Sequence, residues 1–180
     1  MLNNMITCKD KQFKIYLKNE AIQARLKELG QAINVQYQDK NPLFLSVLNG
    51  VFRVVGDLFN YVEVECGVSF VKLQSYAGTN STGEVNTMIG LEVDLTGRHV
   101  ILVEDIVDTG NTLHEFLPQL QALNPASIAI FTLLIKPEAL QHELPLDYVG
   151  FEVPNHFLVG YGLDYDGWGR QHNDIYQLAE

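Results

Sequence analysis

Apolar positions along this chain follow two alternating patterns. Segment 19–35 carries apolar residues at spacings of four, three and four, which predicts an amphipathic helix that ends within 30–36. The continuously apolar run 42–48 predicts a strand buried on both faces, and the Asn49-Gly50 pair after it predicts a turn. Residues 51–62 return to helical spacing. This order of strand, glycine turn and helix is half of a parallel strand-helix-strand unit.

Later apolar runs predict further strands. They span 68–76, 88–95, 98–105, 127–136, 147–154 and 157–165. Between the first two, residues 77–86 are small and polar, which predicts a mobile loop. A helix is expected from 109–112 to Leu123, with a kink or an early end at Pro118, because proline removes a backbone donor. The whole pattern predicts an α/β fold, with a mostly parallel central sheet flanked by helices, in a single domain over 1–180.

Composition narrows the class of protein. The chain has 22 acidic and 12 basic residues and a formal charge of -10, which argues against binding nucleic acid through a broad basic surface. Cys8 and Cys66 lack the paired spacing of a disulfide framework or zinc site, so both are expected to be reduced thiols. The N-terminus lacks a signal-peptide core, and no apolar run is long enough to span a bilayer. We therefore expect a cytoplasmic protein with no membrane partner.

The stretch ILVEDIVDTGNTL, residues 101–113, carries the candidate chemistry. An apolar strand is followed directly by Glu104, Asp105 and Asp108, although crowded carboxylates repel one another. The turn that follows offers backbone N–H groups and hydroxyls at a helix N-terminus, where a phosphate is favoured. Its residues are Thr109, Gly110, Asn111 and Thr112. The carboxylates would then lie beside the rest of a phosphate ester, where they can hold sugar hydroxyls or a hydrated magnesium ion. Acids that merely cap a helix in an ordinary strand-to-helix turn are the alternative.

This stretch resembles the phosphoribosyl pyrophosphate signature of the type I phosphoribosyltransferases. The resemblance extends over 42–170 and points to the subfamily that acts on hypoxanthine. Residues 48–58 are similar to the pyrophosphate loop of that subfamily, and residues 74–85 to its flexible loop. Residues 133–138 and 149–170 are similar to its purine site. It implies the fold of that family, with a small hood built from terminal segments. It also implies purine salvage, in which phosphoribosyl pyrophosphate reacts with hypoxanthine or guanine and gives IMP or GMP together with pyrophosphate. The cofactor that the resemblance implies is Mg²⁺. A homodimer or homotetramer is expected.

The resemblance also implies residue roles. Asp108 is the general base near purine N7, and Glu104 with Asp105 contacts the ribose hydroxyls or the metal. Thr109, Gly110, Asn111 and Thr112 bind the 5′-phosphate. Pyrophosphate is held by Asn49, Gly50, Ser75, Tyr76 and Arg170. The purine is bound by Lys136, which donates to the 6-oxo group, by Phe157, which stacks, and by Leu158 and Asp164. Asp164 is also an expected metal ligand, together with Glu104 and Asp105.

Each role has a structural alternative, since Lys136 fits a solvated strand end and Phe157 fits a core aromatic. The chain also departs from the family pattern. Asn49 stands where many members carry lysine, Pro118 interrupts the helix behind the phosphate turn, and the unusual tail 166–176 affects the register of Arg170. Two other functions stay open. One is a regulatory or binding protein on this fold, which the acidic charge disfavours for RNA. The other is an enzyme of the same fold that prefers guanine or xanthine.

Overall fold

The computed structural model describes residues 4–74, 86–89 and 91–179. Its α/β body is built on a six-stranded sheet with the order β5-β4-β3-β6-β7-β8. The strands are β3 (Leu43–Leu48), β4 (Gly67–Gln74), β5 (Asn86–Ile89), β6 (His99–Val107), β7 (Ser127–Ile135) and β8 (Leu146–Glu152). All neighbours pair in parallel except β5, which runs antiparallel to β4 on the edge. The α/β fold with a mostly parallel sheet is therefore confirmed.

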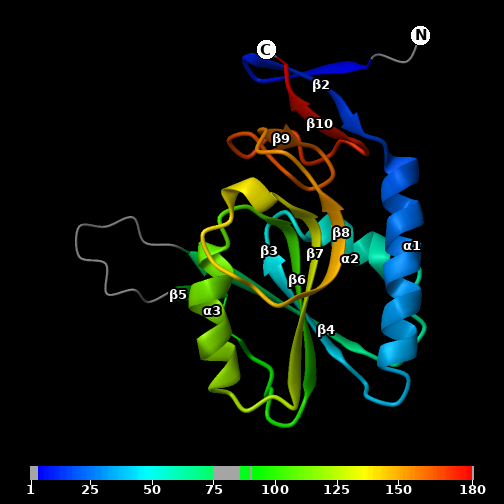
Figure 1. The fold of residues 1–180 in the computed structure, drawn as a ribbon, viewed down its shortest axis with the longest axis vertical. Helices are drawn as coiled ribbons and strands as arrows, with labels where there is room; N and C mark the ends of the chain where they lie inside the picture. The colour runs from blue at the N-terminus through cyan, green and yellow to red at the C-terminus, as the bar shows by residue number, and fades with distance from the viewer. Residues whose placement is uncertain (1–3, 75–85, 90, 180) are drawn as a thin grey trace.

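Helices cover both faces of this sheet (Figure 1). They are α1 (Asn19–Gln36), α2 (Phe52–Leu58) and α3 (Asn111–Gln121), with a short 3₁₀ turn η1 (Pro137–Ala139) after β7. Successive strand residues point to opposite faces. Accordingly, Ile101 packs in one buried cluster with α1 and α2, and Leu102 in another with α3. The apolar runs in β3, β6 and β7 are continuous because helices cover both faces of these strands.

A second, antiparallel sheet forms a hood, shown at the top of Figure 1 together with both chain ends. Its order is β1-β2-β10-β9, with β1 (Met5–Cys8), β2 (Lys11–Leu17), β9 (Leu158–Val159) and β10 (Ile175–Leu178). Since β10 pairs with β2, the two ends of the chain are joined in one sheet. None of the helices in the described ranges is long and apolar enough to cross a lipid bilayer.

Several predicted boundaries are wrong. The helix predicted over 51–62 ends at Leu58, and the strand predicted over 157–165 shrinks to β9, while β1, β2 and β10 were not predicted at all. The helix α3 does not end at Pro118 but continues to Gln121. His114, whose carbonyl loses its helical donor, is exposed together with Pro118, so water can replace that hydrogen bond. Cys8 and Cys66 are free thiols, as expected.

Candidate functional site

A cavity of about 260 Å³ opens at the carboxyl ends of β3 and β6, the edge where open α/β sheets bind ligands. Glu104, Asp108 and the phosphate turn line it together with apolar side chains. The full lining is Val47, Leu48, Leu73, Glu104, Ile106, Val107, Asp108, Thr109, Gly110, Thr112 and Leu113. The polar residues of this lining are predicted from the sequence, whereas the apolar ones are not, because their sequence pattern is that of ordinary strand core. The cavity combines anion-binding and apolar walls, as a phosphorylated sugar requires.

The phosphate turn has the geometry of an anion site. Gly110 precedes α3 in the left-handed conformation, at φ 79°, and as a glycine it makes no side-chain cap. Among the described residues, Asn111 N–H has a side-chain acceptor, Thr109 Oγ1 at a long 3.4 Å, whereas the next N–H groups of the first turn have none. Those donors therefore remain free for a phosphate at the positive end of the helix dipole. Asn111 differs from its neighbours, because its Oδ1 lies 2.7 Å from Nε2 of His142 and its side chain is absent from the cavity lining. The Asn111 side chain is therefore engaged outside the cavity.

The side chains of Glu104 and Asp105 lie on opposite faces of β6. Neighbouring strand residues point to opposite faces, so Glu104 lines the cavity while Asp105 lies against Gly50. Burial and the nearby Asp105 hold the pKa of Glu104 well above its usual value. Burial chiefly raises the pKa of Asp105 to about 6, with a smaller effect from Asp164, although its hydrogen bond from Ile106 N–H acts in the opposite direction. Both acids are thus poised to gain from a cation or from hydroxyl donors.

Asp105 belongs to a second cluster, in which the turn after β3 meets the hood. A side chain at Gly50 would overlap the Asp105 carboxylate, and one at Gly162 would overlap the Gly50 carbonyl, so both contacts require glycine. Arg170 donates to the Gly162 carbonyl over 2.6 Å and forms an ion pair of 2.6 Å with Asp164. The guanidinium also lowers the pKa of Asp105. Arg170 therefore lies beside the Asn49–Gly50 turn.

Lys136 and Asp108 form the most distinctive contact of the site. Lys136 emerges at the end of β7 with only 7% of its surface exposed. Its Nζ donates to Asp108 Oδ2 over 2.7 Å, while the Asp108 side chain remains 48% exposed. A nearly buried ammonium needs a partner. The structure thus rejects a solvated strand-end lysine and places a fixed donor beside a fixed acceptor at the cavity.

The remaining purine candidates lie in the hood. Phe157 is 47% exposed, with an edge contact to the Tyr165 ring and a tilted contact to the Phe13 ring, so it is not a buried core aromatic. The Leu158 side chain is buried, but its backbone is not used by β10. In the antiparallel pair of β9 and β10, the Phe157 carbonyl accepts from Leu178 N–H. Since hydrogen-bonded and non-hydrogen-bonded positions alternate in such a pair, the backbone groups of Leu158 point away from β10. Its N–H and C=O thus face the open edge of β9.

Two expected pyrophosphate residues, Ser75 and Tyr76, and most of the loop 77–86 lie outside the described residues. Their roles stay predictions.

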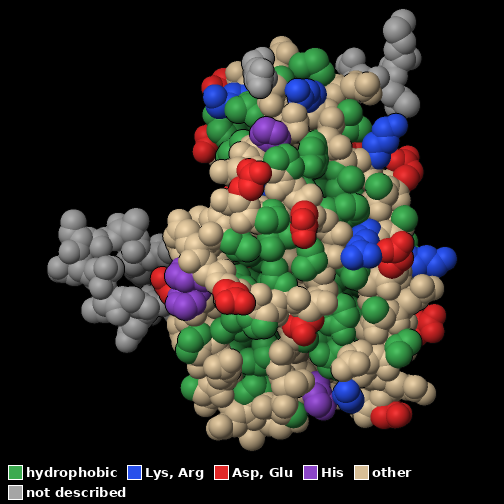
Figure 2. All heavy atoms as spheres, viewed as in Figure 1, with side chains coloured by type: hydrophobic (Ala, Val, Ile, Leu, Met, Phe, Trp, Pro, Cys, Tyr) green, Lys and Arg blue, Asp and Glu red, His purple; other side chains and the backbone are tan. Residues whose placement is uncertain are grey.

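A divalent metal suits the donor set, although it is not a site of three converging ligands. Glu104, Asp105 and Asp164 supply hard oxygen atoms, yet in the described part of the chain no three such groups gather closely enough to hold an ion. Mg²⁺ commonly uses one or two carboxylates together with substrate phosphates and water. On the side shown in Figure 2, acidic side chains are visible on both the hood and the α/β body.

The shifted pKa of Asp105 predicts a pH dependence of stability. Its pKa is about 6 in the fold against an ordinary 3.8, so the folded state retains the proton between these values. Its stabilising contribution is therefore complete below the lower value and lost as the pH rises through 6. We expect the melting temperature of ligand-free protein to fall less steeply, or rise more steeply, from roughly pH 4 to 6 in Asp105→Asn than in the unaltered protein, because Asn cannot contribute this proton-linked loss. Identical slopes would contradict the assignment.

Comparison with known proteins finds similarity over most of the chain. The family model "Phosphoribosyl transferase domain" matches residues 12–166. The chain is 39% identical over 154 residues to the hypoxanthine-guanine phosphoribosyltransferase of Lactococcus lactis subsp. lactis, covering 85% of this chain and 84% of that protein. It is 36% identical over 153 residues to the hypoxanthine-guanine-xanthine phosphoribosyltransferase of Tritrichomonas foetus, with 84% of each chain covered.

Solved structures agree with the sequence comparison. The crystal structure of a hypoxanthine phosphoribosyltransferase from Staphylococcus aureus superposes with a TM-score of 0.87 and 35% identity, covering 92% of this chain and 91% of that one. The similarity therefore extends over nearly the whole of both chains.

Proposed function

Because this chain belongs to the phosphoribosyl transferase family, we propose that it transfers the phosphoribosyl group of phosphoribosyl pyrophosphate to hypoxanthine, and also to guanine, in purine salvage. The bond from the anomeric carbon to pyrophosphate breaks, a bond to purine N9 forms, and the base loses one proton. The products are IMP or GMP and pyrophosphate. The observation that carries this proposal is the Lys136–Asp108 ion pair at the phosphate cavity.

That ion pair matches the edge of a 6-oxopurine. The 6-oxo group accepts hydrogen bonds and the adjacent N7–H donates, so a purine needs one donor and one acceptor side by side. Lys136 Nζ and Asp108 Oδ2, 2.7 Å apart, offer this arrangement. Lys136 then holds O6, and Asp108 takes the proton as the bond to N9 forms. Phe157 stacks on the purine ring. The outward-facing backbone of Leu158, together with Asp164, is available to the opposite edge of the purine.

The phosphoribosyl group occupies the cavity. Its 5′-phosphate binds the backbone donors of the turn at Thr109–Thr112, and Glu104 receives ribose hydroxyls. Pyrophosphate lies at the Asn49–Gly50 turn beside Arg170, whose planar fork suits phosphate oxygens. We assign Mg²⁺ to Glu104 or Asp105 and to Asp164, where it supplies charge neutralisation for the departing pyrophosphate. Ser75 and Tyr76 complete this end of the site.

An activity assay tests which purine bases the protein accepts, since the Tritrichomonas foetus relative is named for xanthine as well as hypoxanthine and guanine. Purified protein with Mg²⁺ and phosphoribosyl pyrophosphate should convert hypoxanthine and guanine to nucleotides. Xanthine conversion would favour the broader specificity. If none of hypoxanthine, guanine, xanthine or adenine gives a nucleotide, the protein is a binding module rather than an enzyme.

Lys136 should determine the preference for 6-oxo over 6-amino purines. A buried donor rejects a group that cannot accept, so we expect kcat/KM for adenine to be lower than for hypoxanthine by at least ~10²-fold. Lys136→Ala should reduce this ratio markedly. Lys9→Ala, which breaks an exposed lysine-aspartate pair in the hood, is the matched control. An unchanged ratio in Lys136→Ala would remove the assignment.

We further propose a single domain over 1–180, a cytoplasmic location and a homodimer or homotetramer. The pairing of β2 with β10 supports a single unit, since it joins both ends of the chain. Self-association is supported by exposed apolar side chains: Val68 and Phe70 share one face of β4, and Phe52 is exposed on α2. Analytical ultracentrifugation would measure the state.

A further inference from the structure

A hydrogen-bonded network connects the hood to the helix that follows the pyrophosphate turn. Tyr161, a fully buried hood residue, donates from its hydroxyl to Asp57 Oδ2 over 2.6 Å. Gln23 of α1 donates to the same oxygen over 2.7 Å. Asp57 lies on α2, the helix that begins just after Gly50. Three segments distant in sequence therefore meet at one carboxylate oxygen.

Tyr161 is held firmly within its own loop. Its backbone adopts the left-handed conformation, at φ 50°, and its N–H donates to the His172 carbonyl over 2.8 Å. The Arg53 guanidinium lies 5.4 Å from the centre of its ring. Burial and the Asp57 carboxylate raise the pKa of the Tyr161 hydroxyl, so it remains a protonated donor at physiological pH. The ring and its hydroxyl thus form a rigid connection.

The next residue gives this connection its relevance. Gly162 packs directly on the Gly50 carbonyl, and its own carbonyl accepts from Arg170. Arg170 in turn pairs with Asp164. The position of these charged groups relative to the Asn49–Gly50 turn therefore depends on how the hood loop is attached to α2. Beside the contact between the two glycines, the partly buried Tyr161–Asp57 hydrogen bond attaches this loop to α2, while a hydrogen bond from Arg53 to Asn173 joins α2 to the hood at an exposed position.

We propose that Tyr161 is a positioning residue for the pyrophosphate half of the substrate, because its hydrogen bond to Asp57 holds Arg170 and Asp164 in place against the Asn49–Gly50 turn. This inference rests on the proposed function. It concerns only one end of the site, since Lys136 and Asp108 belong to β7 and to the loop after β6. Substrate-specific kinetics can therefore separate it from a general effect on folding.

Tyr161→Phe is the direct test, because it removes the hydroxyl and keeps the ring. Asp57 retains Gln23 as a donor, so the variant should fold. We expect the KM for phosphoribosyl pyrophosphate, and for pyrophosphate in the reverse reaction, to rise about tenfold, as for the loss of one hydrogen bond to a charged group. The KM for hypoxanthine and kcat should change by less than about twofold, within the scatter of a neutral substitution.

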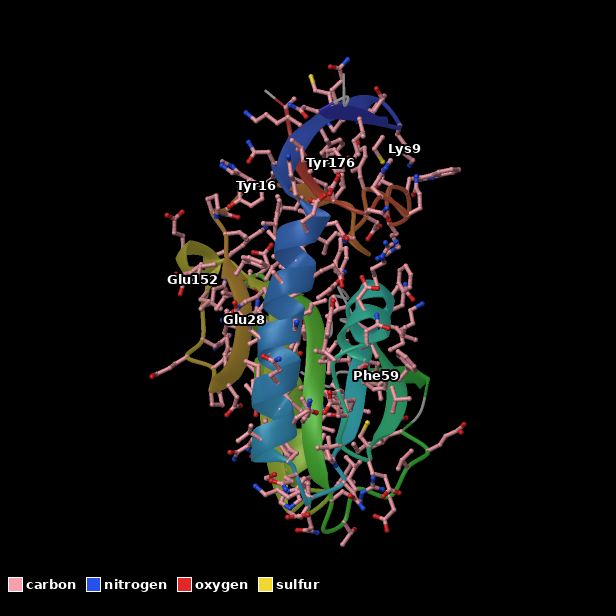
Figure 3. All side chains as sticks on the ribbon, turned by 90° about the vertical axis from the view of Figure 1, so that its right-hand side faces the viewer. Lys9, Tyr16, Glu28, Phe59, Glu152 and Tyr176 are labelled. Carbon is pink, nitrogen blue, oxygen red and sulfur yellow. The ribbon has the colours of Figure 1, made fainter. Side chains whose placement is uncertain are left out.

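Tyr176→Phe is the matched control. Tyr176 is also buried and donates to an aspartate, Asp174, over 3.3 Å. Figure 3 shows it within the hood, whereas Phe59, next to the end of α2, lies in the α/β body. This variant should lose some thermal stability but keep all three KM values. If Tyr161→Phe behaves like Tyr176→Phe, or if its KM for hypoxanthine rises equally, the positioning role is wrong.

Two further measurements keep the inference separate from the proposed function. In a double-mutant cycle, adding Asp57→Asn to Tyr161→Phe should cost little extra affinity, because both changes break the same contact. Additive losses would contradict the connection. Calorimetric binding of magnesium pyrophosphate requires no turnover: tighter binding by the unaltered protein than by Tyr161→Phe supports positioning even if no purine is converted, and equal binding, or no binding by either, overturns it.

Discussion

Asp108→Asn is expected to lower kcat by roughly 10²–10⁴, the usual contribution of a positioned general base. The amide keeps the size of the carboxylate and can still accept from Lys136, but it cannot take the proton that leaves the purine. Because the Asp108 side chain is 48% exposed and the amide oxygen still accepts from Lys136, the variant should fold, with some loss of thermal stability from the ammonium that has lost its countercharge. Turnover at saturating substrates, with both KM values and the melting temperature, measures the effect.

A matched control is Asp166→Asn, which alters another aspartate-lysine pair, that with Lys9, in an exposed part of the hood. It should leave kcat unchanged. If Asp108→Asn turns over as fast as this control, Asp108 is not the base. A parallel rise in both KM values with unchanged kcat would instead assign it to binding.

Arg170→Ala should weaken binding of phosphoribosyl pyrophosphate and pyrophosphate by roughly 10- to 100-fold, the range for losing hydrogen bonds to a charged group. Asn49→Ala should change it only modestly. Because this chain has Asn49 in place of the lysine expected from the family pattern, we expect pyrophosphate to depend on the backbone of the Asn49–Gly50 turn, on Arg170 and on magnesium. Calorimetry with magnesium pyrophosphate compares the two variants.

Arg170 also bonds to the Gly162 carbonyl, so its removal could disturb the hood as well as the anion site. Arg170→Lys addresses this possibility, because it keeps the charge while losing the planar fork, and its affinity should fall between those of the unaltered protein and Arg170→Ala. If Asn49→Ala proves as damaging as Arg170→Ala, the anion depends on the side chain at position 49, and this account fails.

Local sequence patterns were sufficient for most of the α/β body, although the strand predicted over 88–95 is wrong: β5 spans Asn86–Ile89, and residues 91–95 form no strand. The apolar runs that became β3, β6 and β7 are continuous because helices cover both faces of the sheet, and this requirement is visible in sequence. The turn from Asp108 to Thr112 could also be predicted from the sequence, because its residue types and its place before a helix follow from local chemistry. Short hood strands lack this signal: β9 has two residues, and β1 and β10 have four each.

What tertiary structure decided is the partner of each charged or polar side chain. Sequence alone made Glu104 and Asp105 a pair, yet the strand directs one into the cavity and the other toward Gly50 and Arg170. It also left Lys136 between a solvated strand end and a buried donor, until Asp108, 28 positions away, appeared at 2.7 Å. Tyr161 carried no sequence signal at all. Periodicity and turn chemistry act between near neighbours and can be read along the chain, whereas contacts between distant residues arise only when the fold brings them together.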